Sequence, residues 1–226
     1  MLEALLPVFV LVGIVALVFA LLHLAQASSK KRIEDWKQAA GSLGLSWKGT
    51  DEKLAERFPG FYLFKWGDRR RADNCLTGTR DGVQITVADY SYTAGTGKQR
   101  STTGQSICLL TAPDLDLPPF LLRKEFKLLD AIGKAIGGKD INFPDDKEFS
   151  DAFVLQAEDE AAVRRLFTRP VRRAFLTFKG TNVLYEARGP TMLFHRHDHV
   201  GADDLRKMVH DGFDILAALR ESRKDA

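Results

Sequence analysis

The stretch TRDGVQITVADYSY, residues 79–92, decides the fold. Its Asp81-Gly82 pair is a strong signal for a tight hairpin turn. After the turn, apolar and polar residues alternate from Val83 to Val87, as in a strand with one buried face. The alternation then changes phase, since the next large apolar residues are Tyr90 and Tyr92, and this change predicts a bulge or a strand that leaves the sheet.

The segments on either side of this stretch extend it into an antiparallel meander. A glycine- and threonine-rich tip, residues 93–104, leads back to the apolar run SICLLTA, residues 106–112. On the other side, residues 74–79 and the run GFYLFKWG, residues 60–67, are strand candidates because they are rich in aromatic and β-branched residues between turn-forming residues.

The rest of the chain alternates helices and strands around this meander. Apolar residues recur at helical spacing from Ile33 to Leu43, and Pro113, Pro118 and Pro119 predict an irregular crossover. The further predicted elements are helices over 51–58, 124–136, 158–167 and 170–178, a strand over 153–157, a hairpin of residues 182–188 and 191–195, and a last helix from residue 205. This order predicts an α+β domain with a mostly antiparallel sheet and flanking helices.

An apolar segment precedes the domain. Leu5–Leu24 contains twenty residues without a formal charge, and at ~1.5 Å per residue it is ~30 Å long, which matches a bilayer core. A cleaved signal peptide is the alternative, but the start MLEALL lacks Lys and Arg and the apolar run is long for a signal sequence. The sequence therefore predicts residues 1–29 as tail and transmembrane helix, and residues 30–226 as the domain, with two subdomains that divide near 113–150 as an alternative.

The flanking charges predict the orientation. Lys30, Lys31 and Arg32 follow the span directly, and basic flanks stay cytoplasmic, so the N-terminus is expected outside and the domain inside the cell. Two cysteines, Cys75 and Cys108, fit a reducing compartment. The formal net charge of +3 is far below that of nucleic-acid-binding domains, so no nucleic-acid partner is expected.

The run FHRHDHV, residues 194–200, holds three of the five histidines. His195, His197 and His199 would share one face of a straight strand, with the outer pair ~13 Å apart, whereas zinc binds nitrogen at ~2.0–2.1 Å. One ion could therefore take two of them, but hardly three. We favour a solvated strand end without a cofactor and keep a metal site as the alternative. Asp89, beside Tyr90, is a candidate buried acid.

Basic residues are the other candidate for a binding surface. Arg165, Arg169, Arg172 and Arg173 are expected at outward or junction positions of two consecutive helices, where they could contact anionic lipid or an acidic protein partner. Lys30, Lys31 and Arg32 beside the span are expected to contact lipid or a partner as well, and residues 69–71 form a second, smaller basic run.

Five short motifs carry a resemblance to a known family. In order, they are DYSY (89–92), LPPFLLRKE (117–125), DINF (140–143), EFS (148–150) and VRRLF (163–167). Together they resemble a family of uncharacterised bacterial proteins that have one N-terminal membrane helix and a soluble domain. The family has no assigned activity, so the resemblance implies only the location and architecture of a single-pass protein of the bacterial inner membrane.

Two functions follow as hypotheses. The first is a non-enzymatic interaction or scaffold module on the cytoplasmic side of the membrane. The second is an enzyme of unidentified chemistry, metal-assisted at His195, His197 and His199. A concave pocket that joins His195 or His197 to an acid such as Asp89 would favour the enzyme, and an open site would favour the interaction module.

Overall fold

A single antiparallel sheet organises the domain. The computed structural model describes residues 2–124, 139–196 and 198–224. Nine strands pair in the order β1-β2-β3-β4-β9-β8-β5-β7-β6, and every neighbouring pair is antiparallel. The strands are β1 Ser46–Gly49, β2 Asp68–Arg80, β3 Val83–Ala94, β4 Ser101–Thr111, β5 Leu117–Lys124, β6 Lys139–Asp140, β7 Phe153–Ala157, β8 Val183–Gly189 and β9 Thr191–Arg196.

Helices flank this sheet, which confirms the predicted α+β class. The α-helices are α1 Leu2–Ser42, α2 Leu54–Arg57, α4 Lys147–Ala152, α5 Glu160–Leu166, α6 Arg169–Leu176 and α7 Ala202–Lys224, with 3-10 turns η1 Leu63–Lys65 and η2 Gly97–Gln99. The helix predicted over 124–136 lies almost wholly outside the described residues. β4 pairs with β9, so the sheet runs through both halves of the chain.

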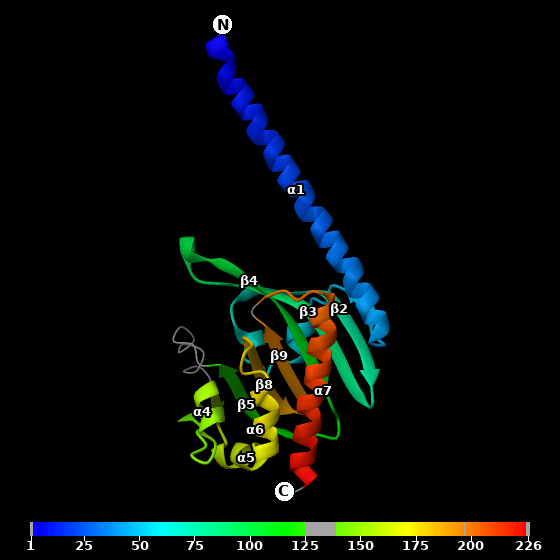
Figure 1. Cartoon of the computed structure of the whole chain (residues 1–226), viewed down its shortest axis with the longest axis vertical. Helices are drawn as coiled ribbons and strands as arrows, with labels where there is room; N and C mark the ends of the chain where they lie inside the picture. The colour runs from blue at the N-terminus through cyan, green and yellow to red at the C-terminus, as the bar shows by residue number, and fades with distance from the viewer. Residues whose placement is uncertain (1, 125–138, 197, 225–226) are drawn as a thin grey trace.

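Helix α1 is one continuous helix whose first described side chains are exposed and whose last part packs on the domain. Its first part projects away from the domain (Figure 1), and its described apolar side chains there, such as Phe19 and Leu24, are exposed. By length and composition this helix can cross a membrane. Its last part packs on the domain through Trp36, Ala39 and Ala40, and it ends before Gly44, whose positive φ suits a helix end.

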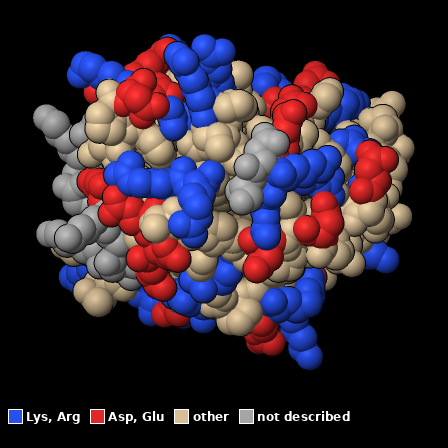
Figure 2. Space-filling model, turned by 90° about the horizontal axis from the view of Figure 1, so that it is seen from below, with Lys and Arg blue, Asp and Glu red and all other residues tan. Residues whose placement is uncertain are grey.

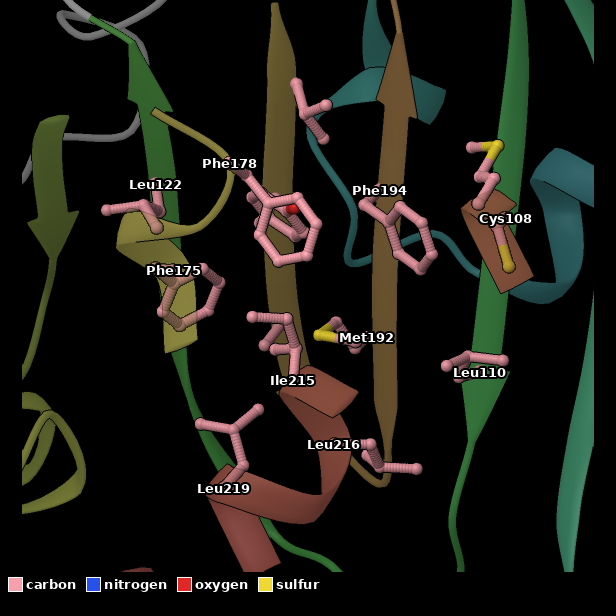
Figure 3. Packing of buried hydrophobic residues seen from close by; sticks show 14 of the residues in the cluster. Cys108, Leu110, Leu122, Phe175, Phe178, Met192, Phe194, Ile215, Leu216 and Leu219 are labelled. Carbon is pink, nitrogen blue, oxygen red and sulfur yellow. The ribbon is translucent and has the colours of Figure 1, made fainter. Parts of the chain in front are cut away.

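The main core lies between one face of the sheet and the helices α6, α7 and the end of α1. Figure 3 shows Phe175 of α6 and Ile215, Leu216 and Leu219 of α7 packed beside side chains of β4, β9 and β5. α7 comes close to the sheet because residue 212 is glycine. A Cβ there would lie 2.6 Å from the Phe194 ring.

A second, smaller core covers the opposite face of the sheet. Leu54 of α2 and Phe61, Leu63 and Phe64 around η1 pack against Tyr90 and its neighbours. The strand predicted for residues 60–67 is therefore wrong, because these residues form bends and the 3-10 turn η1. Three aromatic or aliphatic side chains all point into one core, which a two-faced strand cannot achieve.

The second core also explains the change of phase in β3. β3 pairs with β4 without a break from Gln84 to Ala94, so the predicted bulge in this strand is wrong. Up to Val87 the strand buries its helix-side residues, and from Ala88 onward it also buries residues on the other face. The irregularity lies in the partner strand β2, between Asp73 and Leu76.

The irregular crossover predicted from Pro113, Pro118 and Pro119 is wrong for the last two of these residues. Pro118 and Pro119 lie within β5, a central strand between β7 and β8. They fall where the register with β8 shifts, between Leu117 and Phe120, and pairing with β7 starts only at Phe120. Prolines lack a backbone N–H, so the ladder tolerates them at this irregularity.

Candidate functional site

The candidate site is a polar junction where helix α1 meets the sheet. Asp89 of β3 is buried, on the helix side of the sheet, and the guanidinium of Arg32 donates to both of its carboxylate oxygens, with an Nη2–Oδ1 distance of 2.8 Å. Asn74 Nδ2 donates to it at 2.7 Å and Ser106 Oγ at 2.8 Å. His199 Nδ1 lies 3.0 Å from Oδ1. One carboxylate therefore connects α1, β2, β3, β4 and the loop after β9.

Val200 closes the junction through its backbone. Its carbonyl accepts from Trp36 Nε1 at 3.0 Å and from Arg32 Nη2 at 3.1 Å, and its N–H donates to Ser106 Oγ at 2.9 Å. Asn74 reaches Asp89 from the irregular part of β2, where its φ of 52° is left-handed. These contacts hold α1 to the domain in one orientation.

The electrostatics of Asp89 follow from these partners. Burial raises its pKa, but the hydrogen bonds from His199, Arg32 and Asn74 together lower the pKa by more, and the net pKa is well below the usual range of a carboxyl. The side chain is therefore a carboxylate at neutral pH, with a cation and three further polar groups around it.

The surroundings of Asp89 are open and do not resemble a nucleophilic catalytic site. An open hollow of about 540 Å³ lies here, and its lining residues are Ser28, Ser29, Arg32, Asp73, Asn74, Asp89, Ser91 and His199. Ser106 donates to Asp89 and accepts from Val200, so its hydroxyl is occupied, and it is fully buried. A catalytic triad instead requires a hydroxyl against the second nitrogen of the histidine.

The fold separates His195 from His199, two of the three histidines of residues 194–200. His195 is buried and, by alternation, on the face of β9 that carries Leu193 of the second core. His199 has a 49% exposed side chain at the junction, and His197 lies outside the described residues. Among the residues that are described, no group of three or more His, Cys, Asp or Glu is arranged to hold a metal ion. The histidine beside Asp89 is His199, not His195.

A second hollow lies on the opposite face of the sheet, at Glu186 of β8. Its carboxylate accepts from the backbone N–H groups of Tyr62 and Leu63, at 2.5 and 2.9 Å, and so fixes the turn η1. Burial raises the pKa of Glu186 to about 7, although these hydrogen bonds oppose the rise. A cavity of about 170 Å³ beside it is lined by Tyr62, Glu186 and the exposed side chains of Lys65, Glu158 and Arg188, among others.

The predicted arginine surface on α5 and α6 is less continuous than expected. Arg165, Arg169 and Arg173 are exposed, but the outward placement of Arg172 is wrong, because its side chain is 6% exposed. It binds Asp145 and Asp146, both at 2.7 Å. These acids precede α4, outside the segment that suggested the surface.

The surface formed by Arg165, Arg169 and Arg173 lies far from the apolar part of α1. α5 and α6 lie at the end of the domain that is remote from the N-terminus (Figure 1). On the face seen from that end, basic and acidic side chains are interspersed (Figure 2). Near the apolar helix, Lys30 and Lys31 are exposed, whereas Arg32 is engaged with Asp89.

Sequence reasoning identified Asp89 but missed most of its partners. Arg32 and Trp36 were visible as a basic flank and a helix-face residue, and nothing in their spacing connects them to Val200 or Ser106. Glu186 was missed entirely. A lone acid inside the apolar run VLYEA, residues 183–187, was the available signal, since buried acids are rare unless they are paired or hydrogen-bonded.

Comparison with known proteins gives one informative result. No protein-family model matches the chain, and no curated protein does. Among solved structures, the fold is similar to the crystal structure of the mycobacterial trehalose monomycolate transport factor A, TtfA, with a TM-score of 0.52 and 12% identity over 84% of this chain and 93% of that chain. At 12% identity, the similarity shows only that this chain shares its fold with a bacterial protein, TtfA.

Proposed function

We propose that this chain is a non-enzymatic accessory module that is anchored in a bacterial inner membrane by helix α1 and presents its α+β domain on the cytoplasmic side. Length and composition of α1 support the anchor. The exposed Lys30 and Lys31 after the span support the orientation, because basic flanks stay on the cytoplasmic side.

The Asp89 junction is the observation that carries the proposal. A domain on a flexible tether would sample many orientations, and its tether would be rich in glycine, serine or proline. Here the helix continues from the span into the core, and Arg32 and Trp36 are held by Asp89 and Val200. A fixed orientation suits a module that offers one surface to another membrane protein.

The fold neighbour is consistent with an accessory role. TtfA is described as a transport factor, and an accessory role in moving or assembling a membrane component is our proposal for this chain as well. The surface of Arg165, Arg169 and Arg173 is remote from the anchor, so we propose an acidic protein segment as its partner. Lys30 and Lys31 are proposed to contact anionic lipid.

The test compares rigid and loosened anchors in native membranes. A short Gly/Ser insertion between Ser28 and Ser29 separates the span from the junction, and the same insertion at Gly180, an exposed turn, is the matched control. We expect wild type and control to co-purify in mild detergent with the same membrane protein. The junction insertion should lose that protein while it stays in the membrane fraction and melts at an unchanged temperature.

Two results would contradict the proposal. If the junction insertion retains the partner, a fixed orientation is not required. If a purified, folded chain instead turns over a substrate and loses that activity in His199→Ala without loss of stability, the module is an enzyme.

A further inference from the structure

The hairpin of β3 and β4 extends toward the membrane side of the domain. At the junction the chain direction of β3 is opposite to that of α1, because Ser91, which follows Asp89, lines the same hollow as Ser28 and Ser29, which precede Arg32. From Asp89 to Ala94, where β3 ends, the strand rises five residues, ~17 Å at ~3.3 Å each. From Arg32 to Leu24 the helix rises eight residues, ~12 Å at ~1.5 Å each. The hairpin is thus long enough to reach the level where the span begins.

Figure 1 shows the hairpin at the end of the domain from which α1 projects. The tip of the hairpin, next to the label β4, projects from the end of the domain that faces the N-terminus and diverges from α1. It would therefore meet the membrane surface to one side of the span.

The tip is basic and exposed. Residues 95–102 are all exposed, and no Asp or Glu occurs from Tyr90 to Ala112. Lys98 and Arg100 are at the tip, and Arg69 lies beside its base because Asp68 pairs with Thr93. Among the described residues, Lys98 and Arg69 form no ion pair, and Arg100 pairs with Asp68.

The tip also has a defined shape. Gly95 has a φ of 96°, and a Cβ there would lie 2.5 Å from the Gln99 carbonyl, so the turn closes tightly. Gln99 N–H donates to the Thr96 carbonyl at 3.0 Å, and the hydroxyls of Thr93 and Thr102 pair across the hairpin at 3.0 Å. A preformed turn loses little conformational entropy when it binds. It carries no large apolar side chain, which suits headgroups rather than acyl chains.

From these observations we propose that the β3–β4 tip, residues 95–100, is a second membrane contact that binds anionic phospholipid headgroups through Lys98 and Arg100. The contact rests on the proposed anchoring by α1, which keeps the tip at the leaflet. Lipid is favoured over an acidic protein because the tip and the span lie at the same end of the domain. Two contact points would fix the tilt of the domain on the membrane.

The test uses the full chain in nanodiscs, with a fluorophore on Gln99→Cys and a quencher on lipid headgroups. The native Cys75 and Cys108 are buried, so labelling is selective. We expect strong quenching in discs of phosphatidylcholine with phosphatidylglycerol, and little in phosphatidylcholine alone. At about 1 kcal/mol per basic residue, Lys98→Ser with Arg100→Ser should lower the contact equilibrium roughly 30-fold. Arg165→Ser with Arg173→Ser makes the same charge change at the remote end and should leave the quenching unchanged.

The outcomes separate this proposal from the anchor itself. Equal quenching in both lipid compositions, or no effect of the tip substitutions, would overturn the headgroup contact while the chain still inserts into discs. Failure of the wild-type chain to enter discs or to float with vesicles would instead overturn anchoring by α1. A tip that is unquenched in discs but protected when a membrane protein is added would assign it to a protein partner and refute the lipid contact.

Discussion

At the scale of single residues, Asp89 is the side chain that joins helix α1 to the sheet and to the loop after β9. Asp89→Asn keeps the shape but removes the charge that pairs with Arg32, and it leaves the guanidinium partly buried without its counter-ion. We expect a loss of about 2–4 kcal/mol at neutral pH, measured by denaturant unfolding of the full chain in detergent. Asp198→Asn, an exposed acid beside His199, is the control and should change stability by less than about 0.5 kcal/mol.

The pH dependence of Asp89 has a definite sign. Its folded pKa is lowered, so its stabilisation is present above the unfolded pKa of about 3.9 and is lost as pH falls through the lower folded pKa. The difference between wild type and Asp89→Asn should therefore persist from pH 7 to about pH 4 and shrink only below that. A difference that disappears between pH 7 and 5 would show that another group is responsible.

The contribution of Glu186 to stability depends on pH with the opposite sign. Its folded pKa is raised to about 7, so the folded state holds the proton more tightly, and stability falls as pH rises from about 4.3 toward 7. Glu186→Gln cannot ionise, so we expect wild type to lose stability relative to this variant by about 3 kcal/mol over that range, at about 1.4 kcal/mol per pH unit.

The Glu186 prediction is checked by unfolding at pH 5 and pH 7.5. Glu158→Gln, on the exposed rim of the same cavity, removes the same charge and should show no such change. A parallel pH dependence in wild type and Glu186→Gln would mean that Glu186 ionises at an ordinary pKa.

At the scale of elements, the sequence was sufficient where local chemistry decides the structure. The turn at Asp81-Gly82 has φ of 52° and 74°, which those residue types tolerate, and β7 has the predicted bounds 153–157. The sequence was insufficient where residues far apart in the chain decide the structure. The turn η1 is held by Glu186, more than a hundred residues away, and Arg172 is buried because acids before α4 complete its hydrogen bonds.

The candidate site was likewise predictable only in part, because the partners of Asp89 are far apart in the chain. Asp89 stood out as an acid among apolar residues, but its four side-chain partners come from α1, β2, β4 and the loop after β9. Only the sheet order, which places β4 beside β9, brings the loop of His199 and Val200 next to β3 and α1. A sequence pattern contains no information on that order when the paired residues, such as Ile107 and His195, are 88 residues apart.

At the scale of the whole molecule, the apolar part of α1 and the hairpin tip both extend from the junction toward the same end of the domain. The span leaves the domain at the junction, and the tip rises beside it (Figure 1). The arginines of α5 and α6 are at the opposite end. The membrane would thus be met by the basic tip and by Lys30 and Lys31, while the remote end is free for a partner in the aqueous phase.

This arrangement predicts one topology. Thr177→Cys, on an exposed position at the end of α6, should react with a membrane-impermeant maleimide in spheroplasts only after permeabilisation if the proposed orientation holds, because basic flanks stay on the cytoplasmic side. Glu3→Cys, before the span, is the control and should react without permeabilisation. The reverse pattern would place the domain outside the cell. A soluble protein whose first residue lies near Ser28 would instead identify the apolar segment as a cleaved signal, and would leave Arg32 and Trp36 as a short helix on the domain without an anchor.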